Sequence, residues 1–203
     1  MIDGPARGED RLDLVANSDG EIDLSALTTV ASAGQAQFIV DQGSFNLPNL
    51  SEIQNTNFDL QVGTEISLPQ LTTWNAGSLD VPVGGTFELP NVDTFSGVNV
   101  TLGHDGTLTA PLLVNFLNSK LTLGSNQTIN APQFTNIDNS RFDLRDGAQF
   151  SVAATSYSAT GRTGSDTLFF VSGAGTVLDL SSVQSINDSF NDGSGSELSL
   201  IHI

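Results

Sequence analysis

The sequence predicts an all-β fold, a single-domain parallel β-helix (β-solenoid) of about eight three-sided coils of 21 residues. Three regularities predict it: an apolar position that recurs every 21 residues, strand-like alternation around that position, and a proline that returns at one place in the coil. A repeated unit of this length cannot bury its own apolar face, so it must stack on its neighbours. The recurring apolar residues, here called the anchors, are Phe45, Ile66, Phe87, Leu108, Ile129 and Phe150, extended at wider intervals by Ile22 and Leu178.

Each coil contains three stretches that we expect to face the core. Residues at an anchor alternate between apolar and polar, as in Phe45-Asn46-Leu47, which is the period of a β-strand. A second alternating pair begins eight residues before an anchor, and a third apolar pair lies five and eight residues after it. The second set comprises Phe58 and Leu60, Leu79 and Val81, Val100 and Leu102, Leu121 and Leu123, and Phe142 and Leu144; the third comprises Leu27 and Val30, Leu50 and Ile53, Leu71 and Trp74, Val92 and Phe95, and Leu113 and Phe116.

Prolines and glycines indicate the corners between these stretches. A proline follows the anchor strand in five consecutive coils, where its fixed φ and missing N–H suit a turn and exclude a helix. A glycine precedes most anchors and marks a second corner. A leucine-rich repeat, the main alternative at this period, lacks support because its consensus asparagine is not regularly placed. The prolines are Pro48, Pro69, Pro90, Pro111 and Pro132, and the glycines are Gly43, Gly63, Gly85, Gly106 and Gly147.

The repeat also defines the domain and its ends. We expect a right-handed coil, because connections between parallel strands favour that hand. Residues 1–203 form one domain, with an irregular stretch over 1–11. Leu12–Leu14 and Leu198–Leu200 resemble strands of coils cut short, so we expect a fragment of a longer array whose partners include neighbouring repeats and whose open ends favour end-to-end self-association. Two longer coils predict protruding loops over 156–166 and between Ile186 and Leu198.

Composition limits the partners. A net charge of −17 from 23 acidic and only 6 basic residues should repel nucleic acid and anionic membranes, and it favours cationic partners. No stretch is long and apolar enough for membrane insertion, and the first residues lack the apolar segment of a signal peptide. The absence of cysteine excludes disulfides and is compatible with an extracellular or cell-surface location.

Two acidic groups are candidate ligands for a calcium ion. Asp59 and Asp80 are expected to lie one above the other on adjacent coils, where a divalent cation would relieve their repulsion. Asp188, Asp192 and Glu197 belong to a loop rich in oxygen ligands and glycine, although its spacing matches neither an EF-hand nor a calcium-binding β-roll. A solvated acidic face and an ordinary turn-rich loop explain both groups more simply, so we predict no required cofactor.

Lys120, Arg141 and Arg145 form the one basic cluster on this acidic surface. Lys120 and Arg141 occupy equivalent positions on successive coils, and we expect Arg145 one corner further on. The cluster could contact an anionic glycan, or supply the base of a polysaccharide lyase in a groove walled by residues 160–166. Simple salt bridges to Asp143 and Asp146 are the competing interpretation.

Other chemistry has little support in the sequence. His104 and His202 are the only histidines, and neither has the neighbours of a zinc site or of a Ser-His-Asp triad. A carboxylate pair of the glycosidase type has no distinguishing pattern among so many acids. Ice binding would need a regular Thr-x-Thr column, which is absent.

The repeat units resemble those of very long, repeat-rich bacterial surface proteins of the adhesin type. The resemblance rests on Leu47-Pro48-Asn49-Leu50-Ser51, Leu68-Pro69-Gln70-Leu71-Thr72-Thr73 and the stretch 177–186, and it extends over nearly the whole chain. It implies a secreted, fibrous stalk with an attachment or structural role and no catalytic residues. We therefore expect a non-enzymatic structural module, with a carbohydrate-active β-helix, a lyase or a glycan-binding module, as the alternative.

Overall fold

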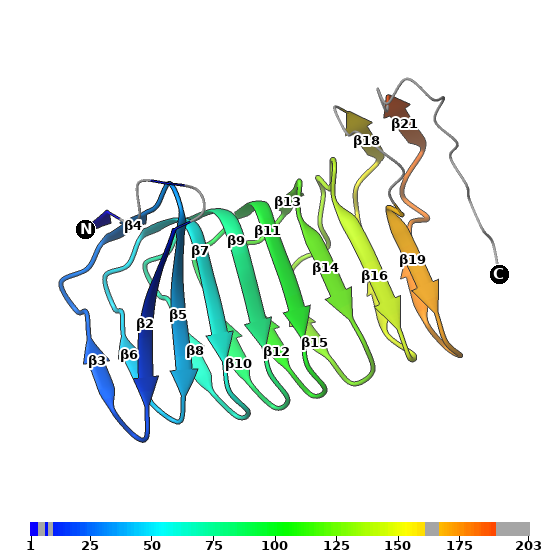
Figure 1. Ribbon diagram of the computed structural model, residues 1–203. Helices are drawn as coiled ribbons and strands as arrows, with labels where there is room; N and C mark the ends of the chain where they lie inside the picture. The colour runs from blue at the N-terminus through cyan, green and yellow to red at the C-terminus, as the bar shows by residue number, and fades with distance from the viewer. Residues whose placement is uncertain (4–6, 8–9, 161–166, 190–203) are drawn as a thin grey trace.

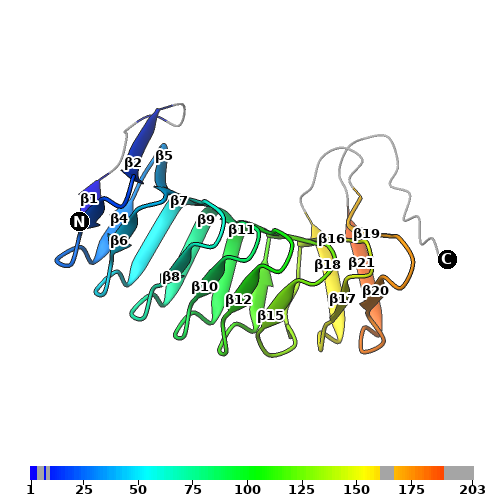
Figure 2. The same cartoon turned by 90° about the horizontal axis from the view of Figure 1, so that it is seen from below.

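The computed structural model describes residues 1–3, 7, 10–160 and 167–189, and it is a β-solenoid of parallel strands stacked about 21 residues apart. In this part of the chain every residue in regular structure belongs to a strand and none to a helix. Figure 1 shows the long strands side by side in one layer, and Figure 2 shows the short strands beneath them. The predicted fold class is confirmed.

The largest sheet has eleven strands and forms the broad face of the solenoid. Its central strands β7, β9 and β11 each span two of the three predicted stretches, because the chain bends between them without losing its hydrogen bonds to the next coil. The strands of this sheet are β1 (Ile2–Asp3), β2 (Arg11–Asn17), β4 (Thr29–Ala31), β5 (Gln35–Asp41), β7 (Glu52–Leu60), β9 (Thr73–Val81), β11 (Thr94–Leu102), β13 (Asn115–Leu117), β14 (Lys120–Leu123), β16 (Arg141–Arg145) and β19 (Phe169–Ser172).

The anchors lie in short strands that form the other side of each coil. In the centre they pair in strict register, with Ile66, Phe87 and Leu108 as successive partners. The central four-stranded sheet comprises β8 (Glu65–Ser67), β10 (Thr86–Glu88), β12 (Thr107–Thr109) and β15 (Thr128–Asn130). Separate two-stranded sheets comprise β3 (Glu21–Asp23) with β6 (Ser44–Asn46), β17 (Gln149–Ser151) with β20 (Val177–Asp179), and β18 (Ser156–Thr160) with β21 (Ser185–Ser189).

The solenoid has about six turns, slightly fewer than the eight predicted. All eight anchors lie in short strands. The four central anchors form the four-stranded sheet, whereas the two anchors at each end of the solenoid form a separate two-stranded sheet, Ile22 with Phe45 and Phe150 with Leu178. An anchor requires only one inward apolar side chain, whereas a regular turn also requires hydrogen-bonded partners on every side. Counting anchors therefore overestimates the number of regular turns.

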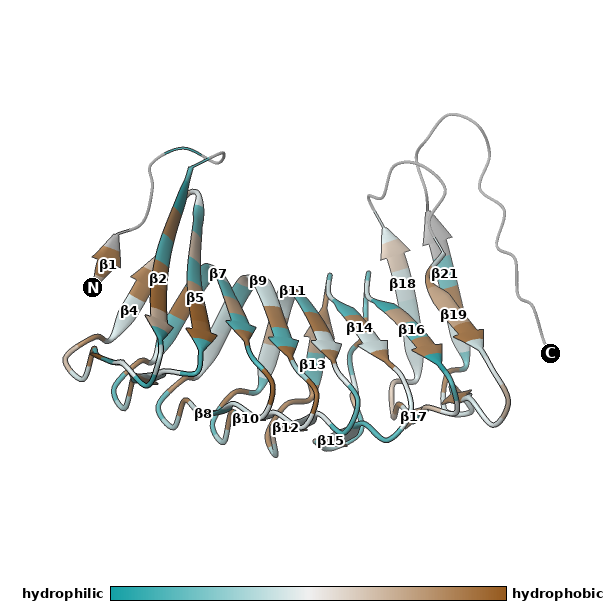
Figure 3. Ribbon diagram, turned by 60° about the horizontal axis from the view of Figure 1, so that its bottom comes forward, coloured by the Kyte–Doolittle hydropathy of each residue, from teal (hydrophilic) through white to brown (hydrophobic). Residues whose placement is uncertain are grey.

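A continuous apolar core fills the interior. Alternation along the strands, visible as hydrophobic and hydrophilic bands in Figure 3, sends every second side chain inward. Trp74, Phe95 and Phe116 come from successive coils and are fully buried, with ring centroids 5.4 Å and 6.2 Å apart. The predicted inward column five and eight residues after each anchor is confirmed.

Two kinds of corner close each coil. Pro48, Pro69 and Pro111 occupy the second position of turns in which the fourth residue donates a backbone hydrogen bond to the first.

At the other predicted corner, a residue with left-handed φ recurs every 21 positions, and it coincides with the predicted glycine only at Gly63 and Gly147. In the remaining coils the left-handed residue precedes the predicted glycine, which instead allows close packing: a Cβ on Gly43 would lie 2.6 Å from the carbonyl carbon of Ala16.

A third corner, which the sequence analysis missed, lies within the long strands. Its residues have left-handed φ values between 49° and 74° and recur every 21 positions. They bend the chain between two stretches of the broad sheet, which is why β7, β9 and β11 continue through them. The residues are Asn55, Ala76, Gly97, Asn118 and Asn139.

The loop prediction is partly wrong. Ser156–Thr160, expected to protrude, forms β18 and pairs in parallel with β21, which includes Asn187, Asp188 and Ser189 of the second predicted loop. Pairing satisfies the backbone groups of these additional residues without a protruding loop. Residues 161–166 and 190–203, including Leu198–Leu200, lie outside the described part of the chain. No helix long and apolar enough to cross a membrane occurs in the described residues.

Candidate functional site

The predicted basic cluster lies on the outer face of the broad sheet. Lys120 of β14 and Arg141 of β16 are direct partners in the ladder, as the repeat predicted. Both side chains point outward, because the residues that follow them, Leu121 and Phe142, are buried in the core. The 21-residue period thus places two cations on adjacent strands, which lie roughly 4.8 Å apart.

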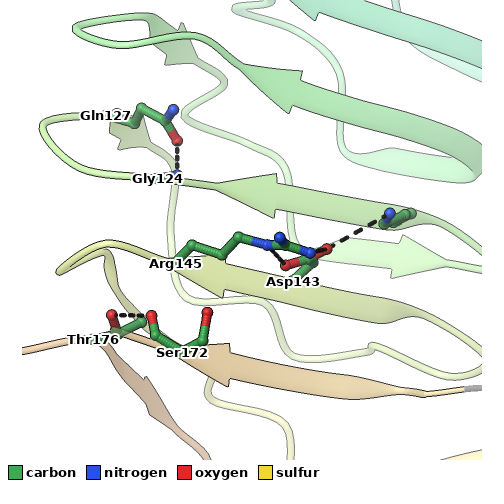
Figure 4. Close-up of polar contacts among 7 residues, drawn as sticks. Gly124, Gln127, Asp143, Arg145, Ser172 and Thr176 are labelled. Atoms are coloured by element: carbon green, nitrogen blue, oxygen red, sulfur yellow. Dashed lines mark hydrogen bonds and ion pairs between the residues drawn. The ribbon is translucent and has the colours of Figure 1, made fainter. Parts of the chain in front are cut away.

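Arg145 joins this cluster from the same strand as Arg141. It is the last residue of β16, so its expected place beyond a corner is wrong: the strand continues two residues past Asp143 before the chain turns. Residues two apart in a strand share a face, and this proximity allows a paired contact. Arg145 Nε donates to Asp143 Oδ1 at 2.7 Å, and Nη2 donates to Oδ2 at 3.0 Å (Figure 4).

Together with Phe170 of β19 and Thr167, which precedes that strand, the cluster lines a shallow hollow of about 300 Å³. Thr167 and Phe170, which the sequence analysis did not assign to a site, form its wall on the β19 side. The predicted wall over 160–166 falls almost entirely outside the described residues. The hollow is lined by Lys120, Arg141, Phe142, Asp143, Arg145, Thr167 and Phe170.

Asp143 is largely committed to Arg145. The hydrogen bonds from Arg145 hold the pKa of the Asp143 carboxyl below its usual value, and the charges of Arg145 and Lys120 act in the same direction. Conversely, Asp143 raises the pKa of the Arg145 guanidinium, first through these hydrogen bonds and then through its charge, with a small addition from the charge of Asp146. The salt bridge that the sequence analysis offered as a competing interpretation is therefore present at Asp143.

Lys120 is less firmly held. Its Nζ lies 3.9 Å from Asp143 Oδ2, a distance at which charges attract but no hydrogen bond forms. Its side chain is 43% exposed, whereas that of Asp143 is 15% exposed. The ammonium group of Lys120 can therefore approach a ligand without first losing a hydrogen bond to Asp143.

Phe170 adds an aromatic surface beside these charges. It is the ladder partner of Asp143, and 39% of its surface is exposed. The Arg145 guanidinium carbon lies 4.8 Å from the centre of the Phe170 ring, in a cation–π arrangement. Arg145 is thus fixed from two sides, by a carboxylate and by an aromatic ring.

Two rows of outward side chains extend from the hollow across the broad sheet, parallel to the solenoid axis. Their members are successive partners in the strand ladder. Outside the hollow, which contains Asp143, the acidic members lie on β2, β7 and β9; hydroxyl and amide groups predominate between Asp80 and the hollow, and the basic members lie at the hollow. The first row is Asp13, Gln37, Asn57, Ser78, Asn99, Lys120 and Arg141, and the second is Val15, Ile39, Asp59, Asp80, Thr101, Thr122, Asp143 and Phe170.

The acidic pair Asp59 and Asp80 lies in register, as predicted. Partial shielding from water raises the pKa of the Asp80 carboxyl, and the neighbouring charge of Asp59 raises it further. Within the described ranges, no group of three or more histidine, cysteine or acidic side chains is arranged to hold a metal ion. Of the other proposed ligands, Asp188 lies in β21, whereas Asp192 and Glu197 lie outside the described residues.

His104 lies at an exposed corner. Its Nδ1 is 2.9 Å from Asp105 Oδ2, and both side chains are more than half exposed. The amide of Asn126 lies 3.5 Å from its other ring nitrogen. These contacts belong to neighbouring corners of the solenoid, and His202 lies outside the described residues.

Side chains that the sequence analysis overlooked secure the corners beside the hollow. The Gln127 amide donates to the carbonyl of Leu102 and accepts from the backbone N–H of Gly124 (Figure 4). Thr176 Oγ1 donates to the carbonyl of Ser172 at 2.7 Å and accepts from the N–H of Gly147 at 2.8 Å. No periodic signal in the sequence identifies these contacts, because neither Gln127 nor Thr176 makes a contact that recurs at the same position of the other described coils.

In comparisons with protein-family models, curated proteins and solved structures, nothing matches this chain.

Proposed function

We propose that the chain is a non-enzymatic structural module of the adhesin-like type, carried by a large bacterial surface protein and exposed outside the cell. One observation carries this proposal: a ladder of parallel strands continues across the broad face from β2 to β19. Each coil is held by backbone hydrogen bonds to its neighbours, so the unit is suited to span distance rigidly.

The corners of the central coils support the same function. They are short turns closed by backbone hydrogen bonds, such as Thr64 N to Gln61 O at 3.1 Å and Gly106 N to Gly103 O at 2.8 Å. Enzymes usually build a deep pocket from longer loops on a rigid scaffold. These turns are too short to wall such a pocket, and the hollow at Lys120 is shallow.

The composition is consistent with an exposed surface location. The chain contains no cysteine and carries a net charge of −17, which keeps an extended surface soluble and limits nonspecific contact with nucleic acid. These properties support an extracellular module in which a repetitive polar face is displayed along a rod.

The test combines shape and activity. With about six turns at roughly 4.8 Å, the unit is about 29 Å long. We expect small-angle X-ray scattering of the purified chain to match a rigid particle of that length, and we expect no new chain ends when it is incubated with neutral and anionic polysaccharides, with or without calcium. Chain ends that accumulate in proportion to protein would contradict the non-enzymatic proposal and support the lyase or hydrolase alternative. Loss of that cleavage in Lys120→Ala would place the activity in the hollow.

A further inference from the structure

We propose that the hollow around Lys120 binds the anionic groups of an acidic polysaccharide that lies along the two outward rows, parallel to the solenoid axis. The inference adds a ligand to the proposed structural module, and it rests on that proposal only in taking the ligand to be bound and not cleaved. It is carried by the placement of the charges, the aromatic wall and the polar rows.

The charges favour an anion at the hollow. Among the described residues, its lining contains three cations and one carboxylate, and both oxygens of that carboxylate already accept hydrogen bonds from Arg145. Lys120 contributes three N–H donors and Arg141 a guanidinium with several, both on the outward face. Charge-assisted hydrogen bonds from such groups to carboxylate or sulfate are stronger than those between neutral groups.

The neighbouring surface favours a sugar as the carrier of that anion. Phe170 is partly exposed at the edge of the hollow, so the apolar face of a pyranose ring can pack against the part of it that Arg145 leaves open. Toward β9, the rows present Thr122, Thr101 and Asn99, whose hydroxyl and amide groups can bind sugar hydroxyls. Successive coils repeat at roughly 4.8 Å, which is about the length of one sugar unit in an extended polysaccharide.

The acidic end of the rows limits the footprint. Asp80 and Asp59 follow Thr101 in the second row and would repel a polyanion. The ligand should therefore extend from Phe170 over β16, β14 and β11 and end before β9. This distance accommodates only a few sugar units.

The net negative charge of the chain does not prevent this contact. At physiological ionic strength charges are screened beyond roughly 8 Å, so a ligand in the hollow experiences mainly the cluster around it. A long polymer that followed the whole face would also meet the acidic coils, so only a short stretch of the ligand contacts the cluster and the rest leaves the face before β9. The surface at Phe170, Thr122 and Thr101, which suits sugar rings and sugar hydroxyls, then favours a polysaccharide over DNA.

Affinity gel electrophoresis of the full chain tests the proposal, with polygalacturonate, dextran sulfate, neutral dextran or single-stranded DNA cast in the gel. We expect polygalacturonate, dextran sulfate or both to retard the wild type, and the pattern identifies carboxylate or sulfate as the bound group. Lys120→Ala should weaken binding about tenfold, which corresponds to the loss of one charge-assisted contact. Lys120→Arg should retain it.

Arg11→Ala is the matched control. Like Lys120, which lies beside Asp143, Arg11 is an outward cation beside a carboxylate of the same sheet, with its Nε 2.7 Å from Asp13 Oδ1. It belongs to β2, far from the hollow. This variant removes the same charge and should leave retardation unchanged.

Three results would overturn the proposal: equal retardation by neutral dextran or DNA, equal weakening by Arg11→Ala, or no retardation of the wild type. Unchanged thermal melting in each variant separates loss of binding from loss of fold, and new chain ends in the same samples would contradict the proposed function instead.

Discussion

At the scale of the residue, the stacked carboxylates of Asp59 and Asp80 destabilise the folded chain. Like charges directly opposite each other on paired strands destabilise a sheet. The pKa of Asp80 is raised first by shielding from water and second by this neighbour, so its ionised form is less favourable in the folded chain than in the unfolded one. Stability is therefore lost as pH rises from the unfolded pKa through the raised folded pKa.

Asp80→Asn should accordingly stabilise the protein at pH 7. We expect the free energy of unfolding to rise by about 0.5 kcal/mol, a small gain because the side chain remains exposed to solvent. Urea denaturation followed by circular dichroism measures the change at pH 7 and again at pH 3, where the gain should largely disappear. A gain of equal size at both pH values, or a loss at pH 7, would show that charge repulsion is not its cause.

The residues of the hollow show what a period can and cannot predict. Lys120 and Arg141 are one repeat of 21 residues apart, and the structure makes them ladder partners. The same rule would place Gly164 beside Asp143, whereas the structure places Phe170 there, because the coil is longer at this point. The cations of the hollow were therefore predictable, and its aromatic wall was not.

At the scale of the element, the corner within the long strands requires a left-handed residue in every coil. Asparagine and glycine, which tolerate this conformation, occupy four of the five positions, and alanine occupies the fifth. The sequence contained this signal in Asn55, Gly97, Asn118 and Asn139, but no single residue type occupies this position in every coil, so the period of 21 was not evident there. Burial patterns locate strands efficiently, whereas corners depend on backbone angles that several residue types can adopt.

Ala76 and Gly97 allow a matched test of this corner. Ala76 has φ +58°, so Ala76→Gly should relieve backbone strain and raise the free energy of unfolding by about 1 kcal/mol. Gly97→Ala should lower it by a similar amount through strain alone, because a Cβ there would meet its nearest neighbour only at 3.5 Å. Both values follow from urea denaturation curves.

Gly77→Ala is the third member of the comparison. A Cβ at Gly77 would lie 1.9 Å from the carbonyl oxygen of Thr56, so this variant should lose far more stability than Gly97→Ala. If Ala76→Gly destabilised the protein, or if Gly97→Ala and Gly77→Ala behaved alike, the proposed separation of backbone strain from steric overlap would be wrong.

At the scale of the whole molecule, stability is shared between neighbouring coils. Each coil packs on the one before and the one after, as the contacts of Phe95 with Trp74 and Phe116 show. In such an array a defect disrupts the coils that adjoin it more than distant ones. The fold was predictable at this scale because the same spacing of inward apolar residues recurs in coil after coil, although the number of regular turns was overestimated.

Phe95→Asp tests whether a defect disrupts mainly the adjoining coils. Burying an unpaired carboxylate in place of a fully buried ring should cost at least about 4 kcal/mol. Hydrogen exchange should show the largest loss of protection in β9, β11 and β13, and less in β2 and β5. Asn99→Asp, on the exposed side of the same strand, should retain the native exchange pattern, and a native melting curve for Phe95→Asp would refute the inward assignment.

The unequal distribution of charge along the broad face gives the rod a direction. Among the described residues, Asp59 and Asp80 lie on β7 and β9, whereas Lys120, Arg141 and Arg145 outnumber Asp143 on β14 and β16, so charge is distributed unevenly along the long axis. Because each chain carries a net charge of −17, two such molecules lying side by side would repel each other, but less when antiparallel than when parallel. A side-by-side assembly of them would therefore carry a built-in preference for alternating orientation, set by a few outward side chains and independent of the core.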